Sequence, residues 1–335
     1  MKLNNIIPRR LILLLWRIAL RLRNRYLLFP SFCSDYIRYQ RYSSQVAGAK
    51  KDRENLAAMI FREAHRLEKA FSLPEIRPGF GVDRINDLTK LLDGYKNAGH
   101  PLDDIAIQKA TAVLNEYLRY HESISCDLGG ILESVKKWAD PKCTVGGYLE
   151  LDRQEILNGA KGDFEDFALS RWSIRSYTEL AISDDVLLDA VRIARKTPSV
   201  CNRQAWKAYV IKSEACKKAV LALQTGNRGF GISCSCVIVV TADMRFFVGP
   251  GERNESFVDG GMFAMSLLYA LHYKGVGVCP LNWMVTPRKD KKLRNILEIS
   301  PSENVIMMMV VGNIPERVRV AKSARRNVED FVVFK

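Results

Sequence analysis

Apolar residues recur at three- and four-residue steps through much of residues 1–150, which is the spacing of one face of an α-helix. The clearest pattern covers residues 51–71, and its repeating positions are Leu56, Met59, Ile60, Ala64, Leu67 and Phe71. Further helical patterns cover residues 83–97, 103–122 and 128–138, and Asp103 and Asp104 after Pro101 are typical of a helix start. This part of the chain is therefore predicted to be mainly helical, without a defensible strand.

Beyond about residue 163, short apolar runs alternate with helical patterns. Strands are predicted at residues 206–211, 235–241 and 305–311, with a strand or loop at 279–283. Helices are predicted at about 183–196, 213–224, 257–274 and 286–297. The glycines at 275, 277 and 312 are expected to interrupt these elements, and residues 307–309, all Met, are expected in the sheet core. The alternation predicts an α/β or α+β sheet domain.

Glycine pairs divide the chain. Gly146-Gly147 and Asn158-Gly159 mark a boundary region between the two patterns. We therefore expect an N-terminal segment at residues 1–30, a helical region at 31–160 and a sheet domain at 161–335.

The N-terminal segment is basic. The net charge is +14, and half of it comes from seven Lys and Arg residues within positions 1–34, where no Asp or Glu occurs. Because the excess is partly terminal, we expect no nucleic-acid partner. In a helix, Arg10, Arg17 and Arg21 share a stripe, whereas Leu13, Trp16 and Leu20 lie away from it.

This pattern predicts a basic amphipathic helix that ends near Pro30. The apolar run before Arg17 is too short to span a bilayer, and no cleavage site typical of a signal peptide follows it. Two interpretations stay open: the helix docks on the protein's own core, or it lies on an anionic membrane surface.

Eight cysteines are scattered without the spacing of a zinc knuckle. A chain of 335 residues needs no disulfides to form a core, so we expect a reduced, cytoplasmic protein without a bound metal. If the N-terminal segment binds membrane, the protein would lie at its inner face. His65, Glu68 and Lys69 could form a functional cluster, but the expected interpretation is an exposed, charged helix face.

Alternate positions at 171–175 carry hydrogen-bond donors. Arg171, Ser173 and Arg175 would project from one side of an extended segment, and guanidinium groups bind phosphate through paired bonds. Farther along, Asn202 and Gln204 offer amides that suit the edge of a flat heterocycle. Taken alone, each motif is a solvated segment or a helix exit, but together they suggest a site for a phosphorylated, ring-bearing cofactor.

The order of four motifs resembles that of the nitroreductase family of flavoenzymes. The resemblance covers about residues 163–335 and is carried by 171–175 (RWSIR), 198–206 (PSVCNRQAW), 275–280 (GVGVCP) and 322–326 (KSARR). It implies an α+β fold with a sheet flanked by helices, a homodimer, and flavin mononucleotide (FMN) bound across the subunit interface. Hydride would pass from NADH or NADPH through flavin N5 to a small-molecule electron acceptor, with no catalytic side chain.

The resemblance also implies residue roles. Arg171, Ser173 and Arg175 would hold the phosphate and ribityl chain, and Arg325 with Lys322 would close on the phosphate. Asn202 and Gln204 would face the polar edge of the ring, Pro198 and Ser199 would line it from the partner subunit, and the backbone at Pro280 and Leu281 would offer an N–H near N5.

Two positions depart from the family pattern. Ala205 stands where Pro is common, and Leu281-Asn282 follows Cys279-Pro280 where Gly is frequent. A second hypothesis is a membrane-peripheral partner protein whose sheet domain has lost or reassigned catalysis. It is motivated by the basic N-terminal segment and the long helical extension.

Overall fold

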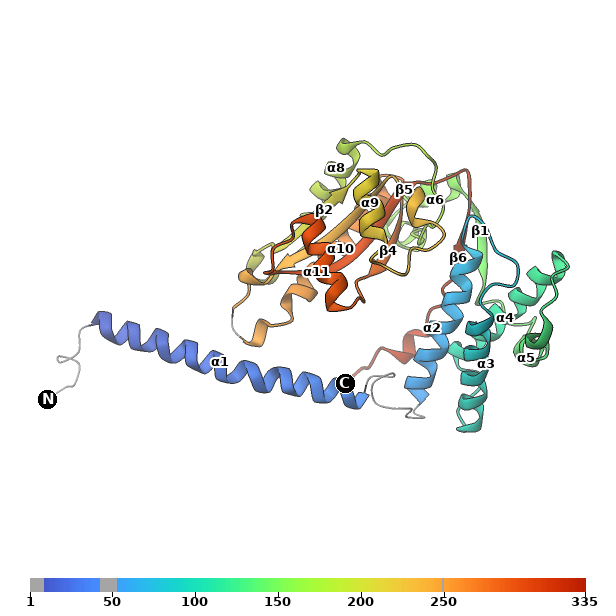
Figure 1. The fold of residues 1–335 in the computed structure, drawn as a ribbon, viewed down its shortest axis with the longest axis horizontal. Coiled ribbons are helices and arrows are strands. Elements are labelled where there is room, and N and C mark those ends of the chain that lie inside the picture. Colours follow the sequence, from blue (N-terminus) through green and yellow to red (C-terminus); the bar gives the residue numbers. More distant parts are fainter. Residues whose placement is uncertain (1–8, 43–52, 249) are drawn as a thin grey trace.

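The computed structural model describes residues 9–42, 53–248 and 250–335 (Figure 1). The predicted N-terminal segment thus lies partly outside the described residues, Lys2 included. So do residues 51 and 52 at the start of the first predicted helix.

The helical region contains α2 (Arg53–Phe71), α3 (Val82–Asn97), α4 (Ile105–Ser123) and α5 (Leu132–Trp138). Their apolar faces form one core, in which Ile60, Leu67 and Phe71 of α2 are almost completely buried. The carboxylate of Asp104 caps α4 by accepting a hydrogen bond from the Ala106 amide at 2.9 Å. The helices predicted from apolar periodicity are therefore confirmed.

The sheet domain is built on four antiparallel strands in the order β2-β3-β5-β4. Their bounds are β2 (Trp206–Ile211), β3 (Cys236–Asp243), β4 (Val276–Asn282) and β5 (Glu303–Asn313). Every residue of β3 is buried, because helices cover both faces of the sheet.

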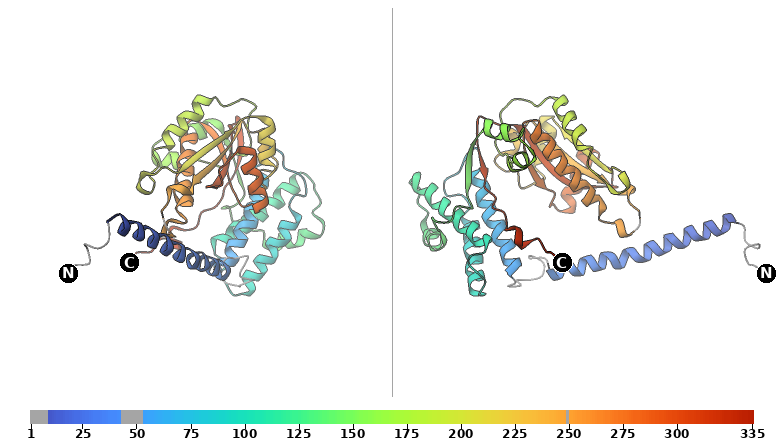
Figure 2. Two further views of the ribbon diagram at one scale, coloured as in Figure 1. Left: turned by 60° about the vertical axis from the view of Figure 1, so that its left-hand side comes forward. Right: turned by 180° about the vertical axis from the view of Figure 1, so that it is seen from behind.

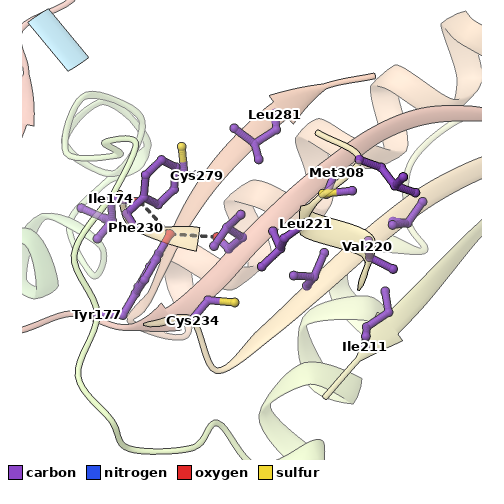
Figure 3. Close-up of a cluster of buried hydrophobic side chains, with 14 of the residues drawn as sticks. Ile174, Tyr177, Ile211, Val220, Leu221, Phe230, Cys234, Cys279, Leu281 and Met308 are labelled. Atoms are coloured by element: carbon purple, nitrogen blue, oxygen red, sulfur yellow. Dashed lines mark hydrogen bonds between the residues drawn. The ribbon is translucent and has the colours of Figure 1, made fainter. Parts of the chain in front are cut away.

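Alternate residues of β3 face different helices. Ile238 and Val240 pack with α8 (Asp184–Ala194) and α10 (Glu255–Tyr273). Val237 and Val239 pack with α9 (Glu214–Leu221) and α11 (Pro287–Leu297), in the core of Figure 3. This arrangement confirms the α+β fold with a sheet flanked by helices. Met308 and Met309 are fully buried, as expected for sheet core.

A two-stranded ladder joins the two regions. The strand β1 (Tyr148–Asp152) pairs antiparallel with β6 (Arg317–Ala321), and α2 contacts β6. Figures 1 and 2 show this ladder between the helical region and the sheet domain. The sequence did not predict either strand, and the pairing brings the tail that follows β6 next to α2.

Gly277 and Gly312 lie inside β4 and β5, although Gly312 was expected to stop its strand and Gly277 to belong to the break after the helix at 257–274. A Cβ atom at Gly312 would lie 2.6 Å from the Tyr177 ring, and one at Gly277 would lie 3.1 Å from the Ile174 side chain. The missing side chains therefore make room for the segment around residues 174–177 to pack on β4 and β5. The predicted helix end before Gly275 is confirmed, since α10 ends at Tyr273, whereas the prediction that Gly312 stops its strand was wrong because of this tertiary contact.

The helix α1 (Arg9–Tyr42) continues through Pro30, so the predicted break there was also wrong. Proline removes one helical N–H, whose acceptor would be the Tyr26 carbonyl, and Tyr26 is 77% exposed, so water can take that place. The helix extends past the rest of the molecule, and Asp35 binds Arg253 of the sheet domain at 2.9 Å (Figures 1 and 2). No helix in the described ranges is long and apolar enough to cross a membrane.

Candidate functional site

The segment 171–177 runs beside β4 in the extended form expected from its alternating pattern. Ser173 forms a parallel bridge with Val278, and the Ile174 amide donates to the Val278 carbonyl at 3.0 Å. The buried Tyr177 hydroxyl donates to the carbonyls of Ile174 at 2.7 Å and Val310 at 3.0 Å (Figure 3). Ile174 and Tyr177 thus fasten the segment to the sheet and fix the position of the donors beside them.

Arg175 is a buried cation without an acidic partner. Its side chain is 4% exposed, and its Nη1 donates to the Ser72 hydroxyl at 3.1 Å and to the Ser173 carbonyl at 3.3 Å. Its Nε is buried without a hydrogen-bond partner, and no carboxylate of the described residues forms an ion pair with it. Because a buried charge is stable only when it is compensated, this guanidinium fits an anionic ligand.

Arg171 and Arg325 lie close enough for their charges to interact. Burial lowers the pKa of Arg171; Tyr269 opposes this effect, and the positive charge of Arg325 adds to it. Guanidinium groups bind phosphate through paired hydrogen bonds, so both arginines are candidates for holding one.

His272 lies beside this pair and carries no additional charge. Burial and the charge of Arg171 lower the pKa of His272 to about 4. One ring nitrogen, Nε2, lies 2.9 Å from the Ser170 hydroxyl. The imidazole is therefore neutral at ordinary pH, which leaves the cationic charge on the arginines.

Two basic residues of the C-terminal tail, Lys322 and Arg325, have different surroundings. The Ser323 amide donates to Glu68 Oε1 at 3.3 Å, and the Lys322 amine donates to the Thr144 carbonyl at 2.9 Å. Lys322 is therefore bound to the loop before β1, whereas Arg325 donates to the Ser323 carbonyl and its charge acts on Arg171. Of the predicted phosphate set, the structure places Arg325 within electrostatic range of Arg171 and binds Lys322 elsewhere.

The turn at 198–204 is held by α10. The buried Asp259 carboxylate accepts hydrogen bonds from the Val200 amide at 3.2 and 3.3 Å. The Gln204 amide N–H donates to the Ser199 hydroxyl at 3.0 Å, and the Gln204 side chain donates to Asn202 Oδ1 at 3.3 Å. Sequence reasoning missed Asp259, although a lone acid within the apolar pattern of 257–274 was a usable signal.

The turn presents its amides outward. Cys201, Asn202 and Gln204 adopt positive φ angles of 49°, 54° and 50°, a strained conformation for residues other than glycine. Asn202 and Gln204 are exposed, and their bonds are with this turn, whereas Arg175 bonds to Ser72. Within one chain, the side chains of Asn202 and Gln204 thus have hydrogen-bond partners different from those of Arg175.

Pro198 borders a hollow of about 550 Å³ at the protein surface. Aromatic side chains of α7 (Phe164–Leu169) and α10 line it, namely Phe164, Phe167, Tyr269 and Tyr273. Pro280 and Leu281 lie near the end of β4, just past the bridge between Ser173 and Val278, and the Leu281 side chain packs in the core (Figure 3).

The expectation that His65, Glu68 and Lys69 lie on an exposed helix face was wrong, because Glu68 is buried and His65 and Lys69 are half-buried. Glu68 is completely buried and lies 2.9 Å from the Lys109 amine and 3.2 Å from His65 Nδ1. Burial favours the neutral acid, but the hydrogen bond from His65 and the charge of Lys109 outweigh it and lower the pKa of Glu68. Packing of α4 and the tail against α2 caused the difference, and helical periodicity does not reveal such contacts.

Comparisons with known proteins match the sheet domain. The family model described as "Nitroreductase family" matches residues 168–313. A putative NADH dehydrogenase/NAD(P)H nitroreductase of Archaeoglobus fulgidus is 31% identical over 146 residues, covering 43% of this chain and 79% of that protein.

Solved structures match about half of the chain. A putative NADH dehydrogenase/NAD(P)H nitroreductase of Parabacteroides distasonis is 17% identical, with a TM-score of 0.45, over 52% of this chain and 98% of that one. A putative nitroreductase of Exiguobacterium sibiricum in complex with FMN is 19% identical, with the same TM-score and the same coverage.

Proposed function

This chain belongs to the nitroreductase family, and on that premise we propose that it is an FMN-dependent oxidoreductase that transfers hydride from NADH or NADPH to a small-molecule acceptor. The observation that carries the proposal is the buried Arg175, whose guanidinium has no acid as partner among the described residues. Two further guanidinium groups, those of Arg171 and Arg325, whose charges act on each other, support it.

The donor set fits the phosphate end of FMN. Arg171, Ser173 and Arg175 would hold the phosphate and the ribityl chain, and Arg325 would close on the phosphate. The orphaned Nε of Arg175 is a donor that such a ligand would satisfy. When bound, FMN supplies a two-electron carrier between the nicotinamide and the acceptor.

The side chains contribute binding and orientation. The fixed guanidinium groups attract and position an anionic ligand, and the sheet keeps them in place through Ile174 and Tyr177. Neutral His272 adds no repulsion to this cluster. Lys322 could join Arg325 on the phosphate only by releasing the Thr144 carbonyl.

The ring end of the proposed site requires a second subunit. Asn202 and Gln204 would meet the polar ring edge, Pro198 and Ser199 would line the ring across a homodimer interface, and the backbone at Pro280 and Leu281 would approach N5. Exposed apolar side chains support such an interface, since Phe164 is 75% exposed, Tyr273 46% and Met262 40%.

The absorption spectrum of the purified full chain tests this function. Protein expressed with ample riboflavin and then mixed with FMN should show a bound, yellow chromophore. Anaerobic addition of NADH or NADPH should bleach it and identify the preferred donor. A colourless protein without flavin affinity would contradict the proposal.

A second candidate is a membrane-peripheral protein, and α1 is the observation that favours it. Large apolar side chains are exposed along this helix, with Trp16 and Leu22 each 62% exposed and Phe29 75%. Arg17 and Arg21 accompany them, a combination that suits an anionic membrane surface. Deleting residues 1–30 should abolish cosedimentation with phosphatidylglycerol vesicles, and unchanged cosedimentation would exclude this anchor. If the intact protein also transferred hydride from NADH or NADPH, it would be a membrane-bound enzyme and not a partner protein that has lost catalysis.

A further inference from the structure

The C-terminal half of α2 reaches the cation cluster of the sheet domain. The Ser72 hydroxyl, just beyond α2, accepts a hydrogen bond from Arg175 Nη1 at 3.1 Å and donates to the Lys69 carbonyl at 2.9 Å. The Lys69 amine donates to the Gly226 carbonyl of the sheet domain at 3.3 Å. Lys69 and Arg175 are therefore linked through one serine, although they come from different regions of the chain.

The Lys69 amine and the Arg175 guanidinium are both positively charged, and both are at least partly buried. Burial lowers the pKa of Lys69, and the positive charge of Arg175 lowers it further. The buried Cys279 thiol lies near both: burial raises its pKa, whereas the charges of Arg175 and Lys69 oppose that rise. The two like charges repel each other, and an anion bound near both would relieve this repulsion.

Lys69 differs from the other basic residues of α2. The others all have an acid within reach: Arg53 pairs with Asp104 at 2.7 Å, Arg62 and Arg66 with Glu63 at 2.8 and 2.9 Å, and His65 with Glu68 at 3.2 Å. Lys69 has no ion pair within the part of the chain that the structure describes and binds only a carbonyl oxygen there. Nearby acids thus compensate the other basic side chains of α2, whereas the charge of Lys69 remains available for an anionic ligand.

A polar hollow of about 370 Å³ borders this place. Ser72 and Ser176, which flank the Arg175 guanidinium and its backbone, line it together with Arg319 of β6. Its two basic residues already have partners, because Arg319 donates to the carbonyls of Leu73 and Pro74 at 3.0 and 2.9 Å and Arg317 lies 3.4 Å from the carboxylate of Glu150, which also lines the hollow. Arg175 and Lys69 are not part of this lining, and neither has an ion pair within the described residues.

We propose that Lys69 and Arg175 form an anion-binding pair that holds a negatively charged or electron-rich group of the bound flavin. The group is either the phosphate or the polar edge of the ring. The inference rests on the proposed function and extends it, because Lys69 lies outside the family match at residues 168–313. It makes the helical region a wall of the cofactor site.

Flavin binding by variants of the full-length protein tests the pair. Dissociation constants for FMN and riboflavin would be measured by quenching of flavin fluorescence in wild type, Lys69→Gln and Lys69→Arg. The matched control is Lys90→Gln, which removes a charge from an exposed position of α3. Lys69→Gln should bind about tenfold more weakly, as expected for the loss of one charge-assisted hydrogen bond. Lys69→Arg and the control should stay close to wild type.

The two flavins identify the bound group. A loss confined to FMN assigns Lys69 to the phosphate, and an equal loss for riboflavin assigns it to the ring edge. Wild-type affinity of Lys69→Gln for both flavins would overturn the inference while leaving the proposed function intact. Absence of flavin binding by the wild type would instead overturn the proposed function together with the pair.

Chemical protection of the wild-type protein gives a test that needs no substitution. Acetylation of lysines by acetic anhydride would be followed by peptide mass spectrometry with and without FMN. FMN should slow modification of Lys69 at least severalfold and leave Lys90 unchanged. Equal modification of Lys69 in both samples would contradict the proposed contact, even if Lys69→Gln failed to fold.

Discussion

The helical region and the sheet domain bury charge in different ways. In the helical region, buried Glu68 lies against Lys109 and His65, so the acid has compensating partners inside the protein. In the sheet domain, Arg175 is also buried, but its guanidinium donates only to a hydroxyl and a carbonyl. Its own Nε has no hydrogen-bond partner. The charge of Glu68 is therefore compensated within the protein, whereas the positive charge of Arg175 is not.

The contrast separates a structural role from a ligand-binding role. A compensated buried pair fixes the packing of the helices that carry it, and removing one partner exposes the full cost of burying the other. An uncompensated buried cation lowers stability in the free protein, and the binding of an anion recovers that loss. Substitutions in the two clusters should therefore affect different measurements.

The largest expected effect is on stability, in the helical region. Glu68→Gln should lower the free energy of unfolding by roughly 3–5 kcal/mol, because it leaves the buried Lys109 amine without its acid. Urea unfolding followed by circular dichroism measures this change. The double variant Glu68→Leu/Lys109→Met should recover much of the loss, since it removes both charges. A Glu68→Gln protein as stable as wild type would show that the pair contributes nothing.

His272 should make the stability of the sheet domain depend on pH. Its pKa in the folded protein is about 4, below the usual value of 6.5, so the unfolded chain binds the proton more readily. Stability should therefore fall as pH drops from about 6.5 toward 4, by roughly 3 kcal/mol at most. His272→Gln should flatten this part of the curve of unfolding free energy against pH. An equally steep curve in that variant would assign the dependence to other groups.

Arg175 should show the opposite behaviour to Glu68. Arg175→Met should weaken FMN binding by about 100-fold, a loss of roughly 3 kcal/mol, because a buried charge-assisted contact disappears. Without flavin, its free energy of unfolding should stay within about 1 kcal/mol of wild type, since an unpaired buried charge is removed. The control Arg192→Met removes an exposed arginine of α8 and should change neither quantity. A large loss of stability with unchanged flavin affinity would reverse the comparison.

Local patterns were sufficient to predict much of the fold. The strand at 206–211 and the helix that begins after Ser183 agree with the structure, because periodicity and a capping residue are encoded nearby. The strands β1 and β6 were missed because each has five residues and pairs with a distant partner, Tyr148 opposite Ala321. Both alternate polar and apolar residues, but five residues are too few for the alternation to predict a strand, and their pairing depends on tertiary structure.

In the candidate site, too, local motifs could be predicted from the sequence and long-range contacts could not. Arg171, Ser173 and Arg175 could be recognised because three donors alternate within one short segment. The contact between Arg175 and Ser72 spans 103 positions and links motifs that have no local signal in common. Lys69 was accordingly grouped with His65 and Glu68 on an exposed face, whereas in the structure its amine binds the Gly226 carbonyl of the sheet domain.

The smallest expected effect concerns Ser72, where the two kinds of charge burial meet. Ser72→Ala removes the hydroxyl that joins Arg175 to the turn of Lys69 and should cost about 1 kcal/mol of stability. FMN binding should weaken by only about threefold, because both cations remain but are less well oriented. Ser176→Ala is the matched control, since it truncates a neighbouring serine that borders the same hollow. If Ser72→Ala lowered stability and left flavin affinity at the wild-type value, Ser72 would belong to the structural cluster alone, and α2 would support the sheet domain without orienting its cations.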